Sequence, residues 1–284
     1  MTDVTHGPLS RLSQEDRDFL QRVRDRRLTY LSDSKAASLM ASCRHIAAAG
    51  IPGGFIEAGC ALGGSAAMIA HLKPRDRPLA LYDVFGMIPA PTAEDPPAVH
   101  ERWRIISSGT SPGIGDDTYY GYQKNLDEVV RRNLRDLGLG CESNAITLVK
   151  GLLQDTLLIT CPVAFAHVDV DWYEPVKTCL VRIFPHLSLG GAIILDDYRN
   201  WGGCKKAADE YLAPHLGKCA VDDSAGSLKI TRTALLGPSP PAPPPRAGTA
   251  RYQSLALCPV RGRSGGRRRR QRRWWRVPGR RRCG

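Results

Sequence analysis

The sequence predicts an α/β fold of the Rossmann-like, doubly wound type, with a mostly parallel sheet covered by helices on both faces. Short apolar runs, typical of buried strands, alternate with longer amphipathic stretches. A glycine-rich turn follows the first of these runs, and later runs end in acidic residues. The chain has 284 residues, of which 42% are hydrophobic and 24% charged. This composition is typical of a globular protein that can bury a substantial core.

Residues 1–50 predict an N-terminal helical segment. Ser13 is typical of a helix N-cap, and Phe19, Leu20 and Val23 give the following helix an apolar side. A second helix is expected from Ser34 to Ala48, because apolar residues recur along it and Gly50 follows.

Residues 51–235 predict the α/β domain itself. Strands are expected at residues 54–58, 79–83, 146–150, 163–170, 192–195 and 227–231, and helices at 65–72, 122–137, 174–184 and 204–212. Residues 86–118 are rich in Pro, Gly, Ser and Asp and are too long for an ordinary connection. They predict a lid or binding loop built around a short helix.

Residues 236–284 differ in composition from the rest of the chain. They hold fourteen Arg and no Lys, Asp or Glu, so residues 1–235 carry a net charge of −2 although the whole chain carries +12. A proline-rich spacer at 238–245 precedes the arginines. We therefore predict a Pro/Arg-rich disordered tail. The alternative is a nucleic-acid-binding arm that neutralises phosphates.

A glycine turn follows the first predicted strand. Glu57 is followed by Gly59, Gly63 and Ser65, where small residues let the backbone approach a ligand and the next helix presents free N–H groups. The glycine spacing differs from the G-x-G-x-x-G dinucleotide pattern. A carboxylate at this position suits a cationic ligand such as S-adenosylmethionine. Asp83 ends the next strand and could accept hydrogen bonds from ribose hydroxyls.

Carboxylates also end two later strands. Asp169 and Asp171 follow one strand, and Asp196 and Asp197 follow another. Because parallel strands end at the same edge of a sheet, we expect these acids to share a crevice. Asp169, Asp196 and Asp197 together would need a divalent cation, and an all-oxygen set suits Mg²⁺, Ca²⁺ or Mn²⁺. The alternative is that Asp196 and Asp197 cap a turn and Asp169 is a satisfied polar residue.

Several segments together resemble the macrocin O-methyltransferase family. They are residues 28–33, 54–65, 150–156, 167–179 and 190–207. The resemblance implies a class I, S-adenosylmethionine-dependent and metal-dependent O-methyltransferase that methylates sugar hydroxyls in natural products. It also implies roles for individual residues. Glu57, Gly59, Gly63, Ser65, Asp83, Gln154 and Asp155 match cofactor positions, and Asp169, Asp196 and Asp197 match metal positions.

Methyl transfer to a hydroxyl also needs a group that takes the proton. Catechol-type relatives place a lysine three positions after the first metal aspartate, where this chain has Trp172. We expect the catalytic carboxylate to be Asp169 or Asp171, which lie on the same side of an ideal strand.

Two other classes of protein compete with this interpretation. A nucleotide-binding oxidoreductase could use the same fold, and a nucleic-acid-binding protein could use the arginine-rich tail. The expected partner is a small-molecule acceptor, either a sugar or a glycosylated compound, and a homo-oligomer is left open. No run of eighteen apolar residues occurs, so we expect no membrane partner. The nine cysteines are scattered and never in C-x-x-C spacing, which is typical of reduced thiols, so we expect a cytoplasmic protein.

Overall fold

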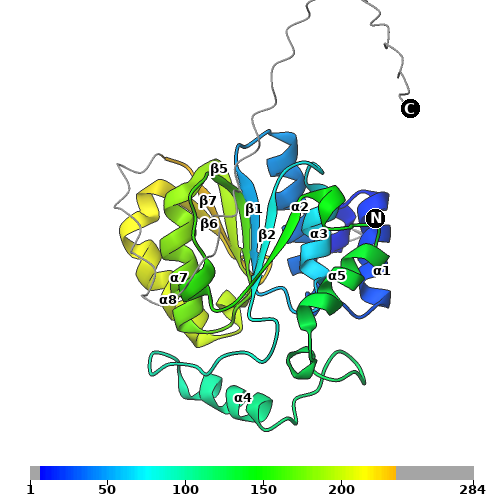
Figure 1. Ribbon diagram of the computed structural model, residues 1–284. Helices are drawn as coiled ribbons and strands as arrows, with labels where there is room; N and C mark the ends of the chain where they lie inside the picture. Colours follow the sequence, from blue (N-terminus) through cyan, green and yellow to red (C-terminus); the bar gives the residue numbers. More distant parts are fainter. Residues whose placement is uncertain (1–6, 235–284) are drawn as a thin grey trace, which may run out of the picture.

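The computed structural model describes residues 7–234, which form one seven-stranded sheet with helices on both faces (Figure 1). The strand order is β3-β2-β1-β4-β5-β7-β6. The first five strands pair in parallel, and β7 runs antiparallel to both of its neighbours. The strands are β1 (Gly54–Ala58), β2 (Leu79–Asp83), β3 (Ile146–Lys150), β4 (Val163–Val168), β5 (Leu187–Leu195), β6 (Cys219–Asp222) and β7 (Leu228–Arg232). The predicted Rossmann-like, doubly wound fold is therefore confirmed.

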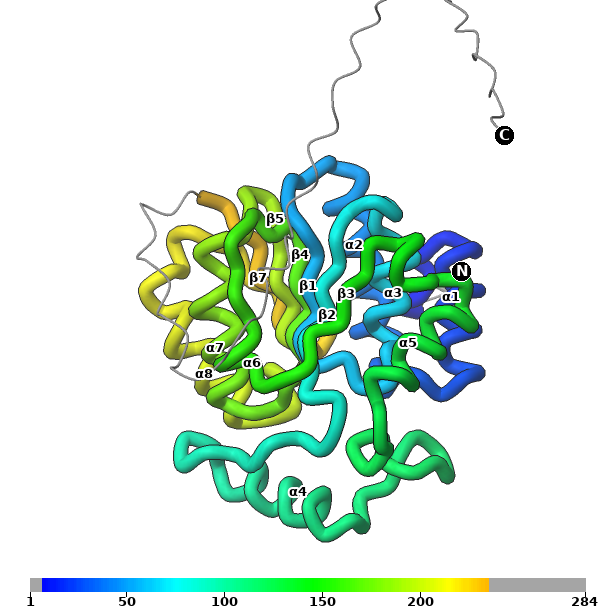
Figure 2. Tube along the Cα trace, in the orientation of Figure 1, coloured from blue at the N-terminus to red at the C-terminus, as the bar shows by residue number. Residues whose placement is uncertain are grey.

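The helices cover the two faces of the sheet unequally. One face carries α1 (Gln14–Asp25), α2 (Asp33–Ala48), α3 (Gly64–Leu72) and α5 (Leu126–Asp136). The other carries α6 (Leu153–Thr156), α7 (Tyr173–Ile183) and α8 (Gly202–Leu212). Figure 2 shows these two groups on opposite sides of the strands.

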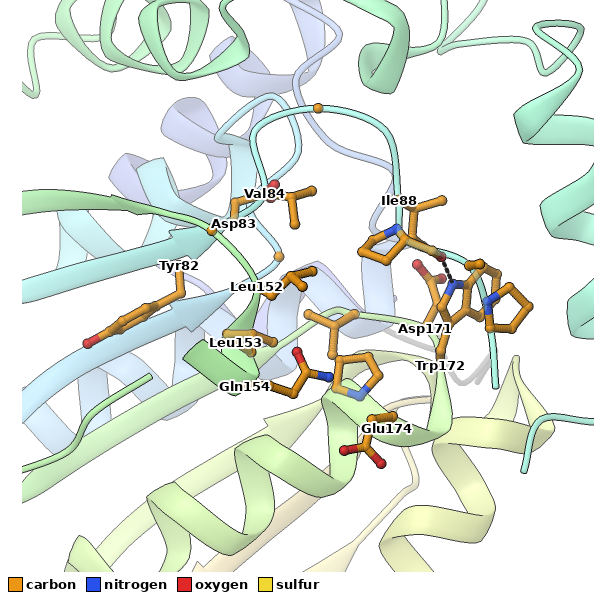
Figure 3. A pocket seen from close by; sticks show the side chains of 18 of the residues that line it. Tyr82, Asp83, Val84, Ile88, Leu152, Leu153, Gln154, Asp171, Trp172 and Glu174 are labelled. Atoms are coloured by element: carbon orange, nitrogen blue, oxygen red, sulfur yellow. Dashed lines mark hydrogen bonds between the residues drawn. The ribbon is translucent and has the colours of Figure 1, made fainter. Parts of the chain in front are cut away.

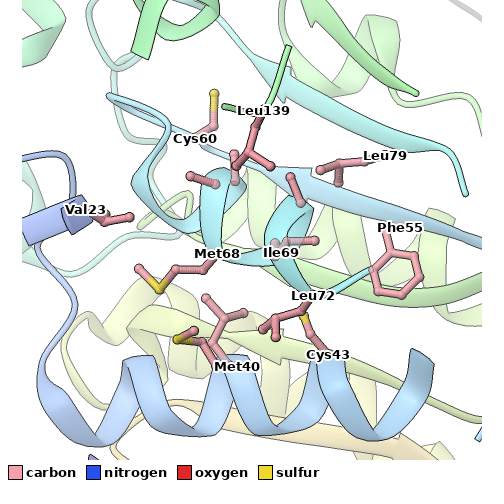
Figure 4. Close-up of a cluster of buried hydrophobic side chains, with 14 of the residues drawn as sticks. Val23, Met40, Cys43, Phe55, Cys60, Met68, Ile69, Leu72, Leu79 and Leu139 are labelled. Carbon is pink, nitrogen blue, oxygen red and sulfur yellow. The ribbon is translucent and has the colours of Figure 1, made fainter. Parts of the chain in front are cut away.

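Strand alternation assigns the core residues to the two faces. Phe55, Phe165 and Ile194 face α1, α2, α3 and α5, and their neighbours Ile56 and Ile193 face the opposite side. In Figure 4, side chains of α2 and α3 pack against one another beside the strands. Because the two N-terminal helices contribute to this cluster, they belong to the same packed unit as the sheet.

The α1 helix is also held by a buried carboxylate. Ser13 caps this helix, as the sequence predicts, by accepting from the backbone N–H of Asp16. The Asp16 side chain, 1% exposed, accepts from Arg44 Nε at 2.9 Å and lies 3.3 Å from His71 Nε2. These contacts connect α1 with α2 and α3.

Several element boundaries differ from the prediction. β5 begins at Leu187 rather than at residue 192, because Ser188, Gly190 and Gly191 interrupt its apolar pattern without breaking the strand. β4 ends at Val168, two residues early, and α5 begins at Leu126 after a 3₁₀ turn at Tyr120–Tyr122. The short β6 and α6 were not predicted at all. The predicted tail at 236–284 lies outside the described residues.

The short helix expected within residues 86–118 is present as α4 (Pro97–Ser107). We call residues 84–122, which surround α4, the lid, and their role as a lid or binding loop stays a prediction. Figure 1 shows this segment beyond the carboxyl ends of the parallel strands, apart from the two helical layers. Within residues 7–234, none of the helices has the length and apolar character needed to span a membrane.

Candidate active site

Two adjoining cavities open between the lid and the carboxyl ends of the strands. Their volumes are about 460 Å³ and 240 Å³. The two cavities share six lining residues: Gly59, Asp83, Tyr120, Asp169, Asp171 and Trp172. A molecule in one cavity would therefore lie against a molecule in the other.

The larger cavity has apolar walls with polar groups at its ends. In Figure 3, Ile88 and Trp172 lie across the cavity from Leu152, Leu153 and Gln154. Asp155 lines the same cavity from α6. Both members of the predicted Gln154–Asp155 pair are therefore placed at this site.

Asp83, at the end of β2, also lines the larger cavity. Its Oδ2 accepts from the backbone N–H groups of Cys60 at 2.8 Å and Ala61 at 3.3 Å. Its Oδ1 accepts from the N–H of Phe85 at 2.7 Å. Burial raises the pKa of Asp83, although these backbone hydrogen bonds oppose the shift. Asp83 thus organises the glycine turn as well as facing the cavity.

The glycines of the turn have different surroundings. Gly59 adopts a φ of +80°, and a Cβ there would collide with the backbone carbonyl of Asp169, which follows the neighbouring strand β4. Gly63 adopts a φ of +86°, but its Cβ would meet Val130 of α5 at 3.1 Å. Gly59 lines both cavities and Gly63 lines neither. Gly63 therefore lies away from both cavities, with the side that a Cβ would occupy packed against α5, and its role in cofactor binding stays a prediction.

Glu57 and Ser65 lie behind the turn rather than at the cavity surface. Glu57 has no exposed surface, and its Oε1 accepts from the Ser65 hydroxyl in the first turn of α3. The same oxygen lies 3.2 Å from Nδ1 of His167. Neither Glu57 nor Ser65 is among the residues that line the two cavities.

The predicted acidic cluster assembles at the ends of β4 and β5. One carboxylate oxygen from each of Asp169, Asp196 and Asp197 lies within 4.8 Å of the others. All three line the smaller cavity. Among the described residues, Oδ1 of Asp196 and Oδ2 of Asp197 are buried without a hydrogen-bond partner. Two of the clustered side chains therefore have a free acceptor oxygen.

Lys35 and His167 flank this cluster. Lys35 Nζ donates to Asp196 Oδ2 at 2.8 Å and to Asn200 Oδ1 at 3.1 Å. His167 Nε2 lies 3.9 Å from Asp196 Oδ1. Sequence reasoning missed Lys35, whose partner is 161 residues away. The sequence analysis did not identify His167 either, because this residue lies within the buried apolar run of β4.

Burial and mutual repulsion shift the pKa values of the clustered carboxylates. Burial, followed by the neighbouring carboxylates, raises the pKa of Asp169 and Asp171 well above the usual value, and that of Asp197 to about 6. Burial also opposes ionisation of Asp196, but His167 and Lys35 outweigh it and lower the pKa of Asp196.

The pKa values of the two flanking basic groups, His167 and Lys35, are raised by the carboxylates. Burial alone would lower their pKa values. The neighbouring carboxylates of Asp196 and Glu57 instead raise the pKa of His167 to about 9, and Asp196 raises the pKa of Lys35. The two basic side chains therefore favour the charged form of Asp196, whereas crowding and burial oppose ionisation of the other carboxylates.

Asp171 reaches the crevice by a turn and not by strand alternation. Because β4 ends at Val168, Asp171 lies outside the strand, with a φ of +56° that non-glycine residues seldom adopt. It lines both cavities together with Asp169. The two carboxylates thus share the crevice as expected, but the strand geometry offered as the reason is wrong.

The smaller cavity is walled by aromatic side chains and closed by the lid. Tyr30, Tyr119, Tyr120, Trp172 and Trp201 line it, and the Tyr119 and Tyr120 rings pack at a centroid distance of 4.4 Å. The cavity thus combines flat apolar walls with a polar floor.

Comparison with known proteins agrees with this arrangement. A protein of Streptomyces niveus named demethyldecarbamoylnovobiocin O-methyltransferase is 34% identical over 125 residues, 39% of this chain and 47% of that protein. A Streptomyces olivaceus protein named 8-demethyl-8-(2,3-dimethoxy-alpha-L-rhamnosyl)-tetracenomycin-C 4'-O-methyltransferase is 30% identical over 193 residues, 66% of each chain. The matched segments thus span less than two thirds of these relatives.

A solved structure and a family model extend the comparison. The structure of the O-methyltransferase NovP is similar with a TM-score of 0.61 at 24% identity, over 73% of this chain and 83% of that chain, which shows the shared fold. Residues 11–218 match the family model described as Macrocin-O-methyltransferase (TylF), which covers the glycine turn, the lid and the acidic cluster. The chain therefore belongs to the macrocin O-methyltransferase family.

Proposed function

We propose that this protein is an S-adenosylmethionine-dependent and divalent-metal-dependent O-methyltransferase that acts on a hydroxyl of a sugar or another natural-product acceptor. The observation that carries the proposal is the pair of adjoining cavities, which Asp169 and Asp171 line together. Methyl transfer requires two ligands to meet with their reacting atoms in line, and adjoining cavities provide that proximity. The names of the relatives from Streptomyces support both the reaction and the kind of acceptor.

The larger cavity suits S-adenosylmethionine, which supplies an activated methyl group when bound. Apolar side chains such as Leu153 can pack on the adenine, and Gln154 offers an amide beside them. Asp83 can accept from the ribose hydroxyls, and Gly59 lets the backbone come close because it lacks a side chain. Glu57 would act through Ser65 and the turn, because it does not reach the cavity.

The smaller cavity suits a divalent cation beside the acceptor. Asp169, Asp196 and Asp197 would hold the ion, and the buried unpartnered oxygens of Asp196 and Asp197 fit this role. An oxygen-only ligand set favours Mg²⁺ or Mn²⁺ over Zn²⁺. When bound, such an ion supplies Lewis-acid chemistry that lowers the pKa of a hydroxyl.

Residues of the protein would orient the acceptor, exclude water and take the acceptor proton. The aromatic walls orient the acceptor ring, and the lid excludes water from both cavities. Asp171 is placed to take the acceptor proton, because it lines both cavities and is outside the predicted set of metal ligands; Asp169 is the alternative. S-adenosylmethionine would supply the methyl group, its C–S bond breaking as the bond to the acceptor oxygen forms, and would leave as S-adenosylhomocysteine.

Calorimetric titration with S-adenosylmethionine, with and without Mg²⁺, tests the cofactor and the metal separately. A panel of glycosylated acceptors with labelled cofactor then tests the reaction. We expect the cofactor to bind with or without metal and transfer to require both. Absence of cofactor binding would reject the methyltransferase proposal, and transfer by metal-free protein would reject the metal dependence. A nucleotide-dependent oxidoreductase would instead bind NAD in a parallel titration.

A further inference from the structure

Four buried polar side chains, which we call the polar line, lie beneath the candidate active site: Ser65, Glu57, His167 and Asp196. Glu57 and His167 are paired across adjacent strands, and each is 0% exposed. His167 Nδ1 lies 3.2 Å from Glu57 Oε1, the oxygen that also accepts from Ser65. Because a carboxylate oxygen can only accept, a ring nitrogen can hold one only if it carries a hydrogen, and this applies both to Nδ1 toward Glu57 and to Nε2 toward Asp196.

The other ring nitrogen of His167 faces the proposed metal ligand. His167 Nε2 and Asp196 Oδ1 lie 3.9 Å apart, and both are buried without a hydrogen-bond partner among the described residues. Buried polar atoms without partners are costly and rarely occur without a reason. The second oxygen of Asp196 is held by Lys35 at 2.8 Å. His167 and Lys35 therefore flank the Asp196 carboxylate.

We propose that His167 is a positioning residue that connects Glu57, behind the glycine turn, to Asp196 and fixes the orientation of the Asp196 carboxylate toward the metal. The inference rests on the proposed function, because it takes Asp196 to be a metal ligand. Groups that orient metal ligands are held rigidly by hydrogen bonds of their own, and loss of such a group commonly lowers metal affinity 10-fold to 100-fold. Glu57 provides that support for His167 from a neighbouring strand.

A role in packing alone is the alternative, and a matched control separates the two. Phe165 lies two residues before His167 on the same face of β4 and is fully buried, but it belongs to the apolar cluster and not to the polar line. Phe165→Leu should therefore disturb the packing of this strand face without changing the polar contacts of Asp196.

The test measures Mn²⁺ binding to the full chain by electron paramagnetic resonance, with S-adenosylmethionine affinity measured in parallel. His167→Phe keeps the ring volume but removes both ring nitrogens, and His167→Gln keeps one donor. We expect the Kd for Mn²⁺ to rise at least tenfold in His167→Phe and by a smaller factor in His167→Gln. Cofactor affinity should stay within about twofold of the wild type, and Phe165→Leu should bind Mn²⁺ as the wild type does.

Two results would overturn the inference. One is wild-type Mn²⁺ affinity in folded His167→Phe or, if that variant does not fold, in His167→Gln. The other is an equal loss of Mn²⁺ affinity in Phe165→Leu, which would show that packing alone is responsible. A wild-type chain that binds no Mn²⁺ would refute the proposed metal site itself, so the two failures are distinguishable.

Discussion

The ring N–H of Trp172 donates to the backbone carbonyl of Pro89 at 3.0 Å and so joins the lid to the end of β4. Nearby, Asp95 of the lid accepts from the backbone N–H of Tyr173 at 2.8 Å, at the start of α7. Both contacts join the segment that covers the cavities to the strand ends beneath it. Trp172 occupies the position at which catechol-type relatives have a lysine, so here this position contributes to closure of the site.

Trp172→Phe should loosen the lid, because phenylalanine keeps an aromatic ring but cannot donate to Pro89. A hydrogen bond contributes about 1 kcal/mol, so we expect S-adenosylmethionine affinity to fall about fivefold. Hydrogen exchange should become faster in residues 84–96 but not in β1. Unchanged exchange in the lid would show that the Trp172 contact does not hold it closed.

Asp83→Asn should weaken cofactor binding by about 1.5–3 kcal/mol, the scale of hydrogen bonds to a charged group. The amide keeps one acceptor oxygen for the turn, so the fold should survive better than in Asp83→Ala. Isothermal titration checks the affinity, and Asp136→Asn on the exposed end of α5 serves as the control. Cofactor affinity equal to that of the control would contradict the ribose assignment.

Gly59→Ala and Gly63→Ala should differ sharply although both glycines have positive φ. At Gly63 we expect a cost of about 1–2 kcal/mol from the backbone conformation, with a small adjustment of Val130. At Gly59 the new methyl group would also collide with the carbonyl of Asp169, so the loss should be larger and cofactor binding should fail. Urea unfolding and cofactor titration of both variants check this, and equal losses would contradict it.

Asp197→Asn should impair metal binding without lowering the stability of the metal-free fold. Its Oδ2 has no partner among the described residues, and it is crowded by Asp169 and Asp196. Loss of this charge should stabilise the metal-free protein and abolish the gain in melting temperature that Mg²⁺ gives the wild type. EDTA should stop turnover by the wild type while the cofactor still binds. If the acids only cap a turn, the substitution will lower the melting temperature at every Mg²⁺ concentration.

Asp16→Asn should make the free energy of unfolding less dependent on pH in the acid range. Burial raises the pKa of Asp16, but Arg44, Ser13 and His71 outweigh it, so the folded-state pKa lies below 3.8. The ionised carboxylate therefore stabilises the fold above pH 4, and this contribution is lost as the pH falls through the folded-state value.

We expect the variant to be about 2 kcal/mol less stable than the wild type at pH 7, because Arg44 is half exposed and the pair is partly screened. The difference should shrink below pH 4 in urea unfolding. Asp18→Asn, on the exposed side of the same helix, is the control. A difference that stays constant between pH 3 and pH 7 would contradict this account.

The sequence by itself determined the elements whose patterns are local. The limits of β1, β2 and β3 agree residue for residue with the prediction, because each is a short apolar run between turns. The positions of Asp169 after β4 and Asp196 after β5 were enough to predict that the two carboxylates meet, because parallel strands end at the same edge of a sheet. Both predictions rest on short local patterns, which depend only on near neighbours in the chain.

Only the tertiary structure decided which groups surround those carboxylates and which side of each glycine is open. Lys35 reaches Asp196 because α2 packs across the sheet, and Gly63 faces Val130 because α5 packs against the turn. His167 joins Glu57 because β1 and β4 are adjacent although 110 residues separate the two side chains. Contacts of this kind depend on how whole elements pack, and no local pattern in the chain encodes them.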